Sequence, residues 1–186
     1  MNLIEKRMAK SADKLSTCHP ILQNVGSKFH LDLTTFLNLT YPDKNYLVEW
    51  TDGYRDPEFQ KELVRLGRSK APPGMSLHNY GLALDFAIFD PGYGLYDWFE
   101  KCPSFWTYVK DLTYALGLHW GGNWKTLVDK PHVSLTLGFA SEKECCLWLL
   151  SVPEKERALK IEERYESKRH ATPRQEDLSG GVSKIH

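Results

Sequence analysis

The segment GLALDFAIF, residues 81–89, alternates in a way that limits what it can form. Every second position is bulky and apolar, which is the spacing of one face of a β-strand. The bulky positions are Leu82, Leu84, Phe86 and Ile88, and the other face holds Ala83, Asp85, Ala87 and Phe89. Such a strand packs its bulky face into a core, while the alanines beside Asp85 leave room for a ligand next to an acidic side chain.

Six further segments predict helices and strands around this strand. Apolar residues recur at helical spacing over about 20–30, 56–66, 104–116 and 141–150. Proline or a capping side chain marks three of the beginnings, at Pro20, Asp56 and Ser141, and Gly67 and Gly117 follow two of the ends. Alternating aromatic and β-branched residues predict strands at 46–51 and from 132 onward. The predicted fold class is α+β, with a small sheet flanked by helices.

Charge and hydropathy exclude several kinds of partner. Lys plus Arg number 24 and Asp plus Glu number 24, so a formal net charge of zero gives no broad field to attract nucleic acid. The longest apolar run, residues 145–150, is far shorter than the roughly 20 residues that cross a bilayer. Residues 1–14 are charged throughout and contain no apolar stretch of a secretory signal. We therefore expect a chain made in the cytoplasm, without an integral membrane segment and without nucleic acid as a partner.

The cysteines give no sign of a disulfide framework. Cys18, Cys102, Cys145 and Cys146 are irregularly spaced, and no two form a CxxC pair. This pattern argues against a disulfide scaffold and against a cysteine zinc site. We therefore expect free, buried thiols.

The length of 186 residues suits one domain with an extension. Beyond Pro153 the sequence is dominated by charged residues, with few large apolar ones and a Gly-Gly pair. We expect one domain over residues 1–152 and a charged C-terminal tail over residues 153–186, partly helical or disordered. The first half of the tail is predicted to be an exposed helix, and residues from about 170 onward to be frayed or disordered.

Two motifs place metal-ligating side chains near the acidic strand. His78 shortly precedes the strand of Asp85, and Asp129 and His132, three residues apart, open a later strand. Each motif alone is weak, because a lone histidine is more often a surface or hydrogen-bonded residue than a ligand. Together, two imidazoles and one carboxylate suit a catalytic Zn²⁺ with a fourth position for water. Asp129 is then a spare carboxylate.

The sequence resembles the zinc L-alanyl-D-glutamate peptidases of bacterial and phage cell-wall lysis, relatives of D-alanyl-D-alanine carboxypeptidases in the hedgehog-like metallopeptidase fold group. The resemblance covers residues of about 15–140. It rests on SLHNYGLALD (76–85) and LHWGGNWKTLVDKPH (118–132), and more loosely on DGYRDPEFQ (52–60) and LSTCHPILQ (15–23). It implies that the small antiparallel sheet carries a zinc site.

The resemblance also implies roles for five residues. His78, Asp85 and His132 look like the zinc ligands, Asp129 like the general base, and Arg55 like a contact to the substrate and the transition state. The related dipeptidases usually carry Glu at the position of Asp129. An Asp before Pro-His therefore favours the endopeptidase branch.

The chemistry of Asp129 agrees with a role as base. A carboxylate beside a metal can take a proton as water attacks the peptide carbonyl. Pro131 restricts the backbone between Asp129 and His132, which would hold the base near the metal without making it a ligand. With an ordinary pKa near 3.9 an aspartate is a poor base, so burial and the metal must tune Asp129.

Other side chains each allow two interpretations. Arg55 offers a planar, permanently charged fork for a substrate carboxylate or an oxyanion, or it forms a surface ion pair beside a helix. The Ser76 hydroxyl binds substrate or satisfies the loop backbone. Trp120 and Trp124 either line a cleft or lie in the core. The exposed loop GRSKAPPGM at 67–75 would border such a cleft.

The predicted function is hydrolysis of the L-alanyl-D-glutamate bond of peptidoglycan stem peptides by a monomeric zinc endopeptidase. A phage-type endolysin that reaches the cell wall after membrane permeabilisation is the expected context. One alternative is a D-alanyl-D-alanine carboxypeptidase or dipeptidase, which needs a pocket for a free carboxylate. Another is a non-catalytic wall-binding module in which zinc only stabilises the fold. The presence of Asp129 and Arg55 argues against this alternative. Another divalent metal could replace zinc, because geometry and availability decide selectivity.

Overall fold

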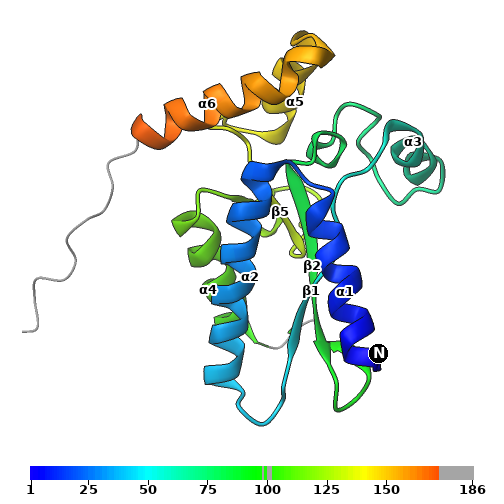
Figure 1. Ribbon diagram of the computed structural model, residues 1–186, viewed down its shortest axis with the longest axis vertical. Helices are drawn as coiled ribbons and strands as arrows, with labels where there is room; N and C mark the ends of the chain where they lie inside the picture. Colours follow the sequence, from blue (N-terminus) through cyan, green and yellow to red (C-terminus); the bar gives the residue numbers. More distant parts are fainter. Residues whose placement is uncertain (98, 100–101, 172–186) are drawn as a thin grey trace, which may run out of the picture.

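The computed structural model describes residues 1–97, 99 and 102–171. Its long strands β1 (Leu47–Asp52) and β2 (Ala83–Asp90) run between helices α1 (Leu3–Ser16) and α2 (Pro20–Thr40), as Figure 1 shows. The sheet is antiparallel, in the order β1-β2-β5-β4, with β3 also paired to β2. The short strands are β3 (Leu95–Asp97), β4 (His119–Trp120) and β5 (His132–Ser134). These elements confirm the predicted α+β class with a small antiparallel sheet flanked by helices.

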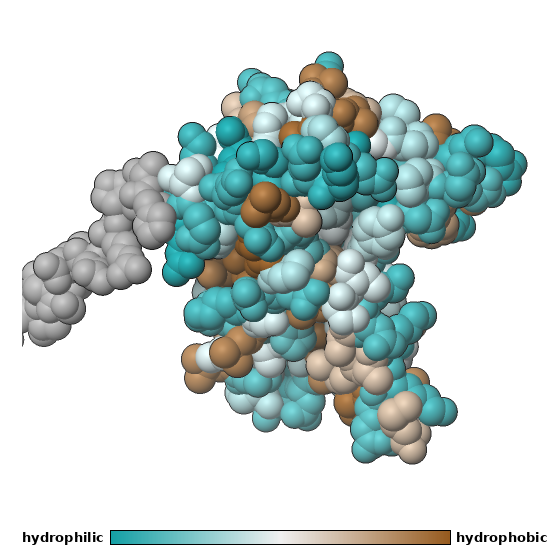
Figure 2. All heavy atoms as spheres, turned by 45° about the horizontal axis from the view of Figure 1, so that its top comes forward, coloured by the Kyte–Doolittle hydropathy of each residue, from teal (hydrophilic) through white to brown (hydrophobic). Residues whose placement is uncertain are grey.

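The remaining helices gather mostly at one end of the sheet. Helices α5 (Glu142–Ser151) and α6 (Arg157–Ala171) lie at the top of Figure 1, with α3 (Pro57–Arg65) beside them. Helix α4 (Pro103–Ala115) lies beside α2. Three short 3-10 turns are η1 (Leu77–Tyr80), η2 (Gly121–Asn123) and η3 (Glu154–Glu156). Figure 2 shows the face around α5 and α6 to be mostly hydrophilic, with hydrophobic residues in small separate patches.

Predicted caps begin several helices. The Asp56 side chain accepts from the backbone N–H of Phe59, and Ser141 accepts from that of Glu144. Helix α2 begins with Pro20 as predicted, but it continues to residue 40 rather than 30. Its buried face explains the extra length, because Leu33 and Leu37 continue the helical spacing of the earlier buried residues.

The core lies between α2 and the bulky face of β2. The ring centroid of Phe29 lies 5.3 Å from that of Phe86 and 5.6 Å from that of Trp50. Leu84 is fully buried in the same cluster. The predicted assignment of the bulky face of β2 to the core is therefore correct.

Helix α1 lies along the outer edge of β1. The backbone N–H of Trp50 donates to the Ser11 hydroxyl at 2.8 Å, which satisfies an edge group that would otherwise be open to another strand. The Arg7 guanidinium pairs with Glu49 and lies 3.6 Å from the ring centroid of Phe89. This helix was not predicted from the sequence, because polar and cationic side chains make several of its contacts to the sheet, and within the described residues Leu15, in its last turn, is its one apolar side chain packed against the core.

Helix α6 occupies the first half of the charged C-terminal segment and is anchored to the rest of the chain. Ile161 is buried, and Arg164 donates through Nε to the carbonyl of Leu137 at 3.0 Å. The Arg164 guanidinium also lies 3.7 Å from the ring centroid of Phe139. The predicted disorder falls mostly on residues 172–186, which lie outside the described residues, and the division of the chain at residue 152 stays a prediction.

All four cysteines are free thiols, as predicted. Cys18, Cys145 and Cys146 are buried, but Cys102 is partly exposed, so the expectation of burial is wrong there. Within the described residues, no helix combines the length and apolar character needed to cross a membrane.

Candidate functional site

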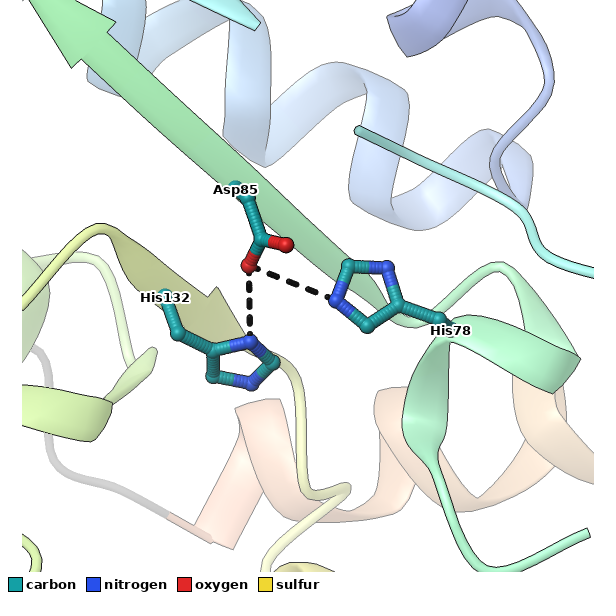
Figure 3. Close-up of side chains that lie close together, drawn as sticks. All are labelled: His78, Asp85 and His132. Atoms are coloured by element: carbon teal, nitrogen blue, oxygen red, sulfur yellow. Dashed lines mark hydrogen bonds and ion pairs between the residues drawn. The ribbon is translucent and has the colours of Figure 1, made fainter. Parts of the chain in front are cut away.

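The three predicted ligand side chains meet at one end of the sheet. His78 lies on η1, Asp85 on β2, and His132 begins β5. In the pairing of β2 with β5, Asp85 stands directly opposite His132, which brings their Cβ atoms to within about 4.5–5.5 Å. One ligand atom from each of the three residues lies within 4.8 Å of the others, and Figure 3 shows the side chains converging.

The ring of His78 is held in one orientation. Its Nδ1 lies 2.6 Å from the carbonyl oxygen of Gly53, which can only accept, so Nδ1 carries the hydrogen and donates. Its Nε2 is buried without a hydrogen-bond partner among the described residues, at 3.4 Å from Oδ1 of Asp85. In the neutral ring, Nε2 therefore turns its lone pair toward a carboxylate oxygen. Two acceptors facing each other in a buried site are unfavourable unless a cation lies between them.

The ring of His132 has a partner on each side. Nδ1 lies 3.0 Å from Oδ1 of Asp85, and Nε2 lies 2.7 Å from Oε1 of Glu142. Burial opposes the charged form of the ring, but the hydrogen bonds to Asp85 and Glu142 outweigh it and raise the pKa of His132 to about 10. Without a cation, a proton therefore stays on this ring at neutral pH.

Asp85 is ionised although its side chain is only 19% exposed. Burial alone would raise its pKa, but the electrostatic interactions with His78 and His132 and the hydrogen bond with His132 hold the pKa of Asp85 well below its ordinary value. Its Oδ1 faces both histidines. Its Oδ2 accepts a hydrogen bond from Nη2 of Arg55 at 2.7 Å.

Arg55 is held by two carboxylates. Its Nε donates to Oδ2 of Asp52 at 2.8 Å, in addition to the bond to Asp85. A register shift in the pairing of β1 with β2 places Asp52 opposite Asp85, so the guanidinium reaches both. Its side chain is 14% exposed, so this is an ion pair at the wall of the site rather than on the open surface.

A cleft of about 560 Å³ opens over these residues. It brings together every predicted site residue, namely Arg55, Ser76, His78, Asp85, Asp129 and His132. The loop at 67–71 borders it, as predicted for this segment. Arg68 and Lys70 of that loop line the cleft and are exposed.

Asp129 is half-buried on the wall of the cleft. Its backbone N–H donates to the Gly121 carbonyl at 3.1 Å, and its own carbonyl accepts from the N–H of His132 at 3.2 Å. Burial, followed by the charge of Asp85, raises the pKa of Asp129 above its ordinary value. Within the described part of the chain, no hydrogen bond or ion pair occupies its carboxylate, which leaves that group free to take a proton.

Trp124 and Glu142 line the cleft but were not among the predicted site residues, although a place in the cleft wall was one interpretation of Trp124. The Trp124 ring lies 5.0 Å from the His132 ring, whereas Trp120 is buried and donates through Nε1 to the Lys130 carbonyl. Glu142 reaches His132 from the first turn of α5. In the sequence it looks like any acidic residue at the start of a helix, such as Glu144, and only packing distinguishes the two.

The donor set fits a divalent cation. Each histidine has one ring nitrogen bound to a fixed acceptor outside the site and the other directed at Asp85. Two neutral imidazole nitrogens and one carboxylate oxygen form the three-ligand set of many catalytic zinc sites. The buried, unpaired Nε2 of His78 is the atom that such a cation would satisfy.

The chain is similar to known peptidases. Residues 69–135 match the family model described as D-alanyl-D-alanine carboxypeptidase. The peptidoglycan L-alanyl-D-glutamate endopeptidase CwlK of Bacillus subtilis (strain 168) is 34% identical over 133 residues, which are 64% of this chain and 74% of CwlK. The crystal structure of the Serratia marcescens L-Ala D-Glu endopeptidase ChiX aligns with a TM-score of 0.44 and 26% identity, over 68% of this chain and 86% of that one. The extent of the match to CwlK, together with the family model, places this chain in the D-alanyl-D-alanine carboxypeptidase family of peptidases.

Proposed function

We propose that this chain is a zinc-dependent endopeptidase that hydrolyses the L-alanyl-D-glutamate bond of peptidoglycan stem peptides. Nε2 of His78, the carboxylate of Asp85 and Nδ1 of His132 would hold the zinc ion. The observation that carries the proposal is the buried Nε2 of His78, which faces the Asp85 carboxylate without a hydrogen bond. The identity with CwlK, whose name gives that bond, supports the choice of substrate.

The residues around the cation site can perform the rest of the hydrolysis. A bound zinc ion would polarise the scissile carbonyl and make water more acidic. Asp129 takes the proton of the attacking water as the hydroxyl joins the carbonyl carbon. The same carboxyl then passes the proton to the D-glutamate nitrogen as the C–N bond breaks. The raised pKa of Asp129 suits this exchange better than that of an exposed aspartate.

Arg55 and Ser76 have supporting roles in this proposal. Nε and Nη2 of Arg55 are bound to carboxylates, and within the described residues no ion pair occupies its Nη1. That atom has donors to offer to the oxyanion that develops during attack. Ser76 lines the cleft beside His78 and makes no capping bond to the η1 backbone, which leaves its hydroxyl to bind substrate.

The charge of the cleft suits an acidic peptide. Arg68 and Lys70 line it, and neither forms an ion pair within the described part of the chain. A stem peptide brings the carboxylate of its D-glutamate to the cleft. Exposed cations close to the reaction site would attract that carboxylate and align the bond to be cut.

Digestion of purified peptidoglycan by the zinc-loaded chain tests the substrate. New N-terminal D-glutamate is expected in the products, and His78→Ala should release none. Release of free D-alanine would instead support the alternative carboxypeptidase, which the description of the family model favours. Wall binding with bound zinc but no released peptide would support the non-catalytic binding module.

We also propose that the chain acts as a monomeric phage-type endolysin. The support is the resemblance of its motifs to peptidases of phage cell-wall lysis. Expression in a bacterium should lower the culture turbidity only when the membrane is permeabilised at the same time. Lysis without permeabilisation, or no lysis in either case, would contradict this role, and sedimentation velocity would test the monomer.

A further inference from the structure

Glu142 contacts the candidate cation site by a hydrogen bond with His132. Its Oε1 lies 2.7 Å from Nε2 of His132, the ring nitrogen opposite to the one that faces Asp85. The two side chains are 18% and 6% exposed, so little water competes for the contact. Glu142 comes from α5 and lies outside residues 69–135, the segment that matches the family model.

We propose that Glu142 is a positioning residue that fixes the tautomer and the orientation of His132 for cation binding. A neutral imidazole carries one hydrogen, on either of its two nitrogens. When a cation replaces the second proton of the ring, the Glu142 carboxylate, which only accepts, holds the remaining hydrogen on Nε2, and the lone pair of Nδ1 is directed at the cation site. This inference rests on the proposed metal centre.

The alternative tautomer shows why an acceptor is needed at Nε2. If Nδ1 carried the hydrogen, it would donate to Oδ1 of Asp85 across the 3.0 Å that separates them. That hydrogen bond would occupy the lone pair and the carboxylate oxygen that a cation needs. Glu142 favours the productive tautomer by bonding to the other nitrogen, which is the usual arrangement around metal-bound histidines.

The two histidines are oriented by different acceptors. Nδ1 of His78 donates to the neutral carbonyl of Gly53, whereas Nε2 of His132 donates to a charged carboxylate. A charged acceptor draws the ring hydrogen more strongly and makes the other nitrogen a stronger donor to a cation. His132 should therefore depend on its partner through charge as well as through geometry.

Helix α5 fixes the position of Glu142. The Ser141 side chain accepts from the backbone N–H of Glu144, and Cys145 and Leu149 are buried against the core. These contacts set where the first turn of α5 lies. Glu144 shares that turn but is exposed, so it offers a control with the same charge and helix position.

Zinc affinity, measured by competition with a chromophoric chelator, tests the proposal without peptidoglycan. In the full chain, Glu142→Ala should weaken zinc binding about 10- to 100-fold, the usual range for such partners of metal ligands. Glu142→Gln should lie between the wild type and Glu142→Ala, because the amide oxygen still accepts from Nε2 but carries no charge. Glu144→Gln should bind zinc as the wild type does.

Thermal unfolding of the zinc-free variants separates positioning from a merely structural role. If Glu142 only anchors α5, its substitution lowers the melting temperature of the zinc-free protein and leaves the zinc affinity within about twofold of wild type, and the proposal is wrong. An equal loss of affinity in Glu144→Gln would also overturn it, since helix charge would then be the cause. Should Glu142→Ala fail to fold, the nearly isosteric Glu142→Gln decides between these outcomes.

The same measurements keep this inference apart from the proposed function. A wild-type chain that holds zinc and needs Glu142 for it, but leaves peptidoglycan uncut, would refute the hydrolase and keep the inference. A chain that cuts peptidoglycan and binds zinc equally well without Glu142 would refute the inference and keep the hydrolase. A wild-type chain that binds no divalent cation would refute both, and affinity alone would show it.

Discussion

Arg55 and Asp85 form an ion pair through only one of the two carboxylate oxygens of Asp85. Nη2 of Arg55 donates to Oδ2 of Asp85 at 2.7 Å, while Oδ1 of Asp85 faces Nε2 of His78 and Nδ1 of His132. One oxygen is thus held by a fixed charge, and the other is presented to the candidate cation site. Arg55 therefore orients a predicted ligand, a role that the sequence did not indicate.

Substitution of Arg55 should weaken cation binding as well as catalysis. In Arg55→Ala, Oδ2 of Asp85 loses its donor and the carboxylate can rotate, so zinc affinity is expected to fall about 10- to 100-fold. Arg55→Lys should recover part of the affinity, because it restores the charge without the fork. Arg65→Ala, which removes an exposed arginine paired with Glu62, serves as the control. Unchanged zinc affinity with a raised KM would mean that Arg55 acts on the substrate alone.

Asp129 should be needed for hydrolysis and dispensable for the metal. Asp129→Asn removes the proton acceptor but keeps the shape of the side chain, so kcat is expected to fall about 10²- to 10⁴-fold with zinc still bound. His78→Ala or His132→Ala should lose both zinc and activity. Metal content and peptide release, measured on the same preparations, check these expectations. Full activity in Asp129→Asn would remove it as the base.

The stability of the zinc-free protein should fall as the pH rises above neutrality. The pKa of His132 is about 10 in the folded chain, above the 6.5 expected when it is unfolded. A raised pKa means that the folded state holds a proton more tightly, so its stabilising contribution is complete below about pH 6.5 and is lost as the pH rises through 10. Melting temperatures of the zinc-free chain between pH 6.5 and 10 test this, with His132→Gln as the control that should lack the dependence. A flat profile in the wild type would contradict it.

Gly53→Ala should disturb the site from outside the cleft. A Cβ at Gly53 would lie 2.3 Å from the carbonyl oxygen of Lys14 and 2.9 Å from Oγ1 of Thr17, so the backbone must shift. The Gly53 carbonyl would then release Nδ1 of His78. We expect a loss of about 1–3 kcal/mol in the free energy of unfolding, with weaker zinc binding.

A remote glycine provides the comparison for that experiment. Gly94 has a positive φ of 69° and open space around it, so Gly94→Ala strains the backbone by about 1–2 kcal/mol without approaching the site. It should lower stability and leave zinc affinity unchanged. If both variants weaken zinc binding equally, general destabilisation rather than the hold on His78 is responsible.

Local sequence patterns predicted the parts of the fold that depend on neighbouring residues. The bulky face of β2, the caps at Asp56 and Ser141 and the proline at the start of α2 all follow from spacing and side-chain chemistry within a few residues. The pattern failed for α1, where Arg7 and Ser11 make the contacts to the sheet. The alternating pattern also predicts a longer strand than β5, which ends at Ser134. The alternation continues to Leu137, but that residue has a positive φ of 53°.

The sequence by itself determined which side chains could bind a cation, two histidines and an aspartate, and which second aspartate could act as a base. Only the tertiary structure decided how they are arranged. Asp85 and His132 are 47 residues apart and meet because of one strand register. Gly53, Arg55 and Glu142 reach the predicted ligands through a turn, a shift in register and the packing of a helix. Propensity and periodicity act over a few neighbouring residues, whereas these contacts depend on how distant elements pack against each other.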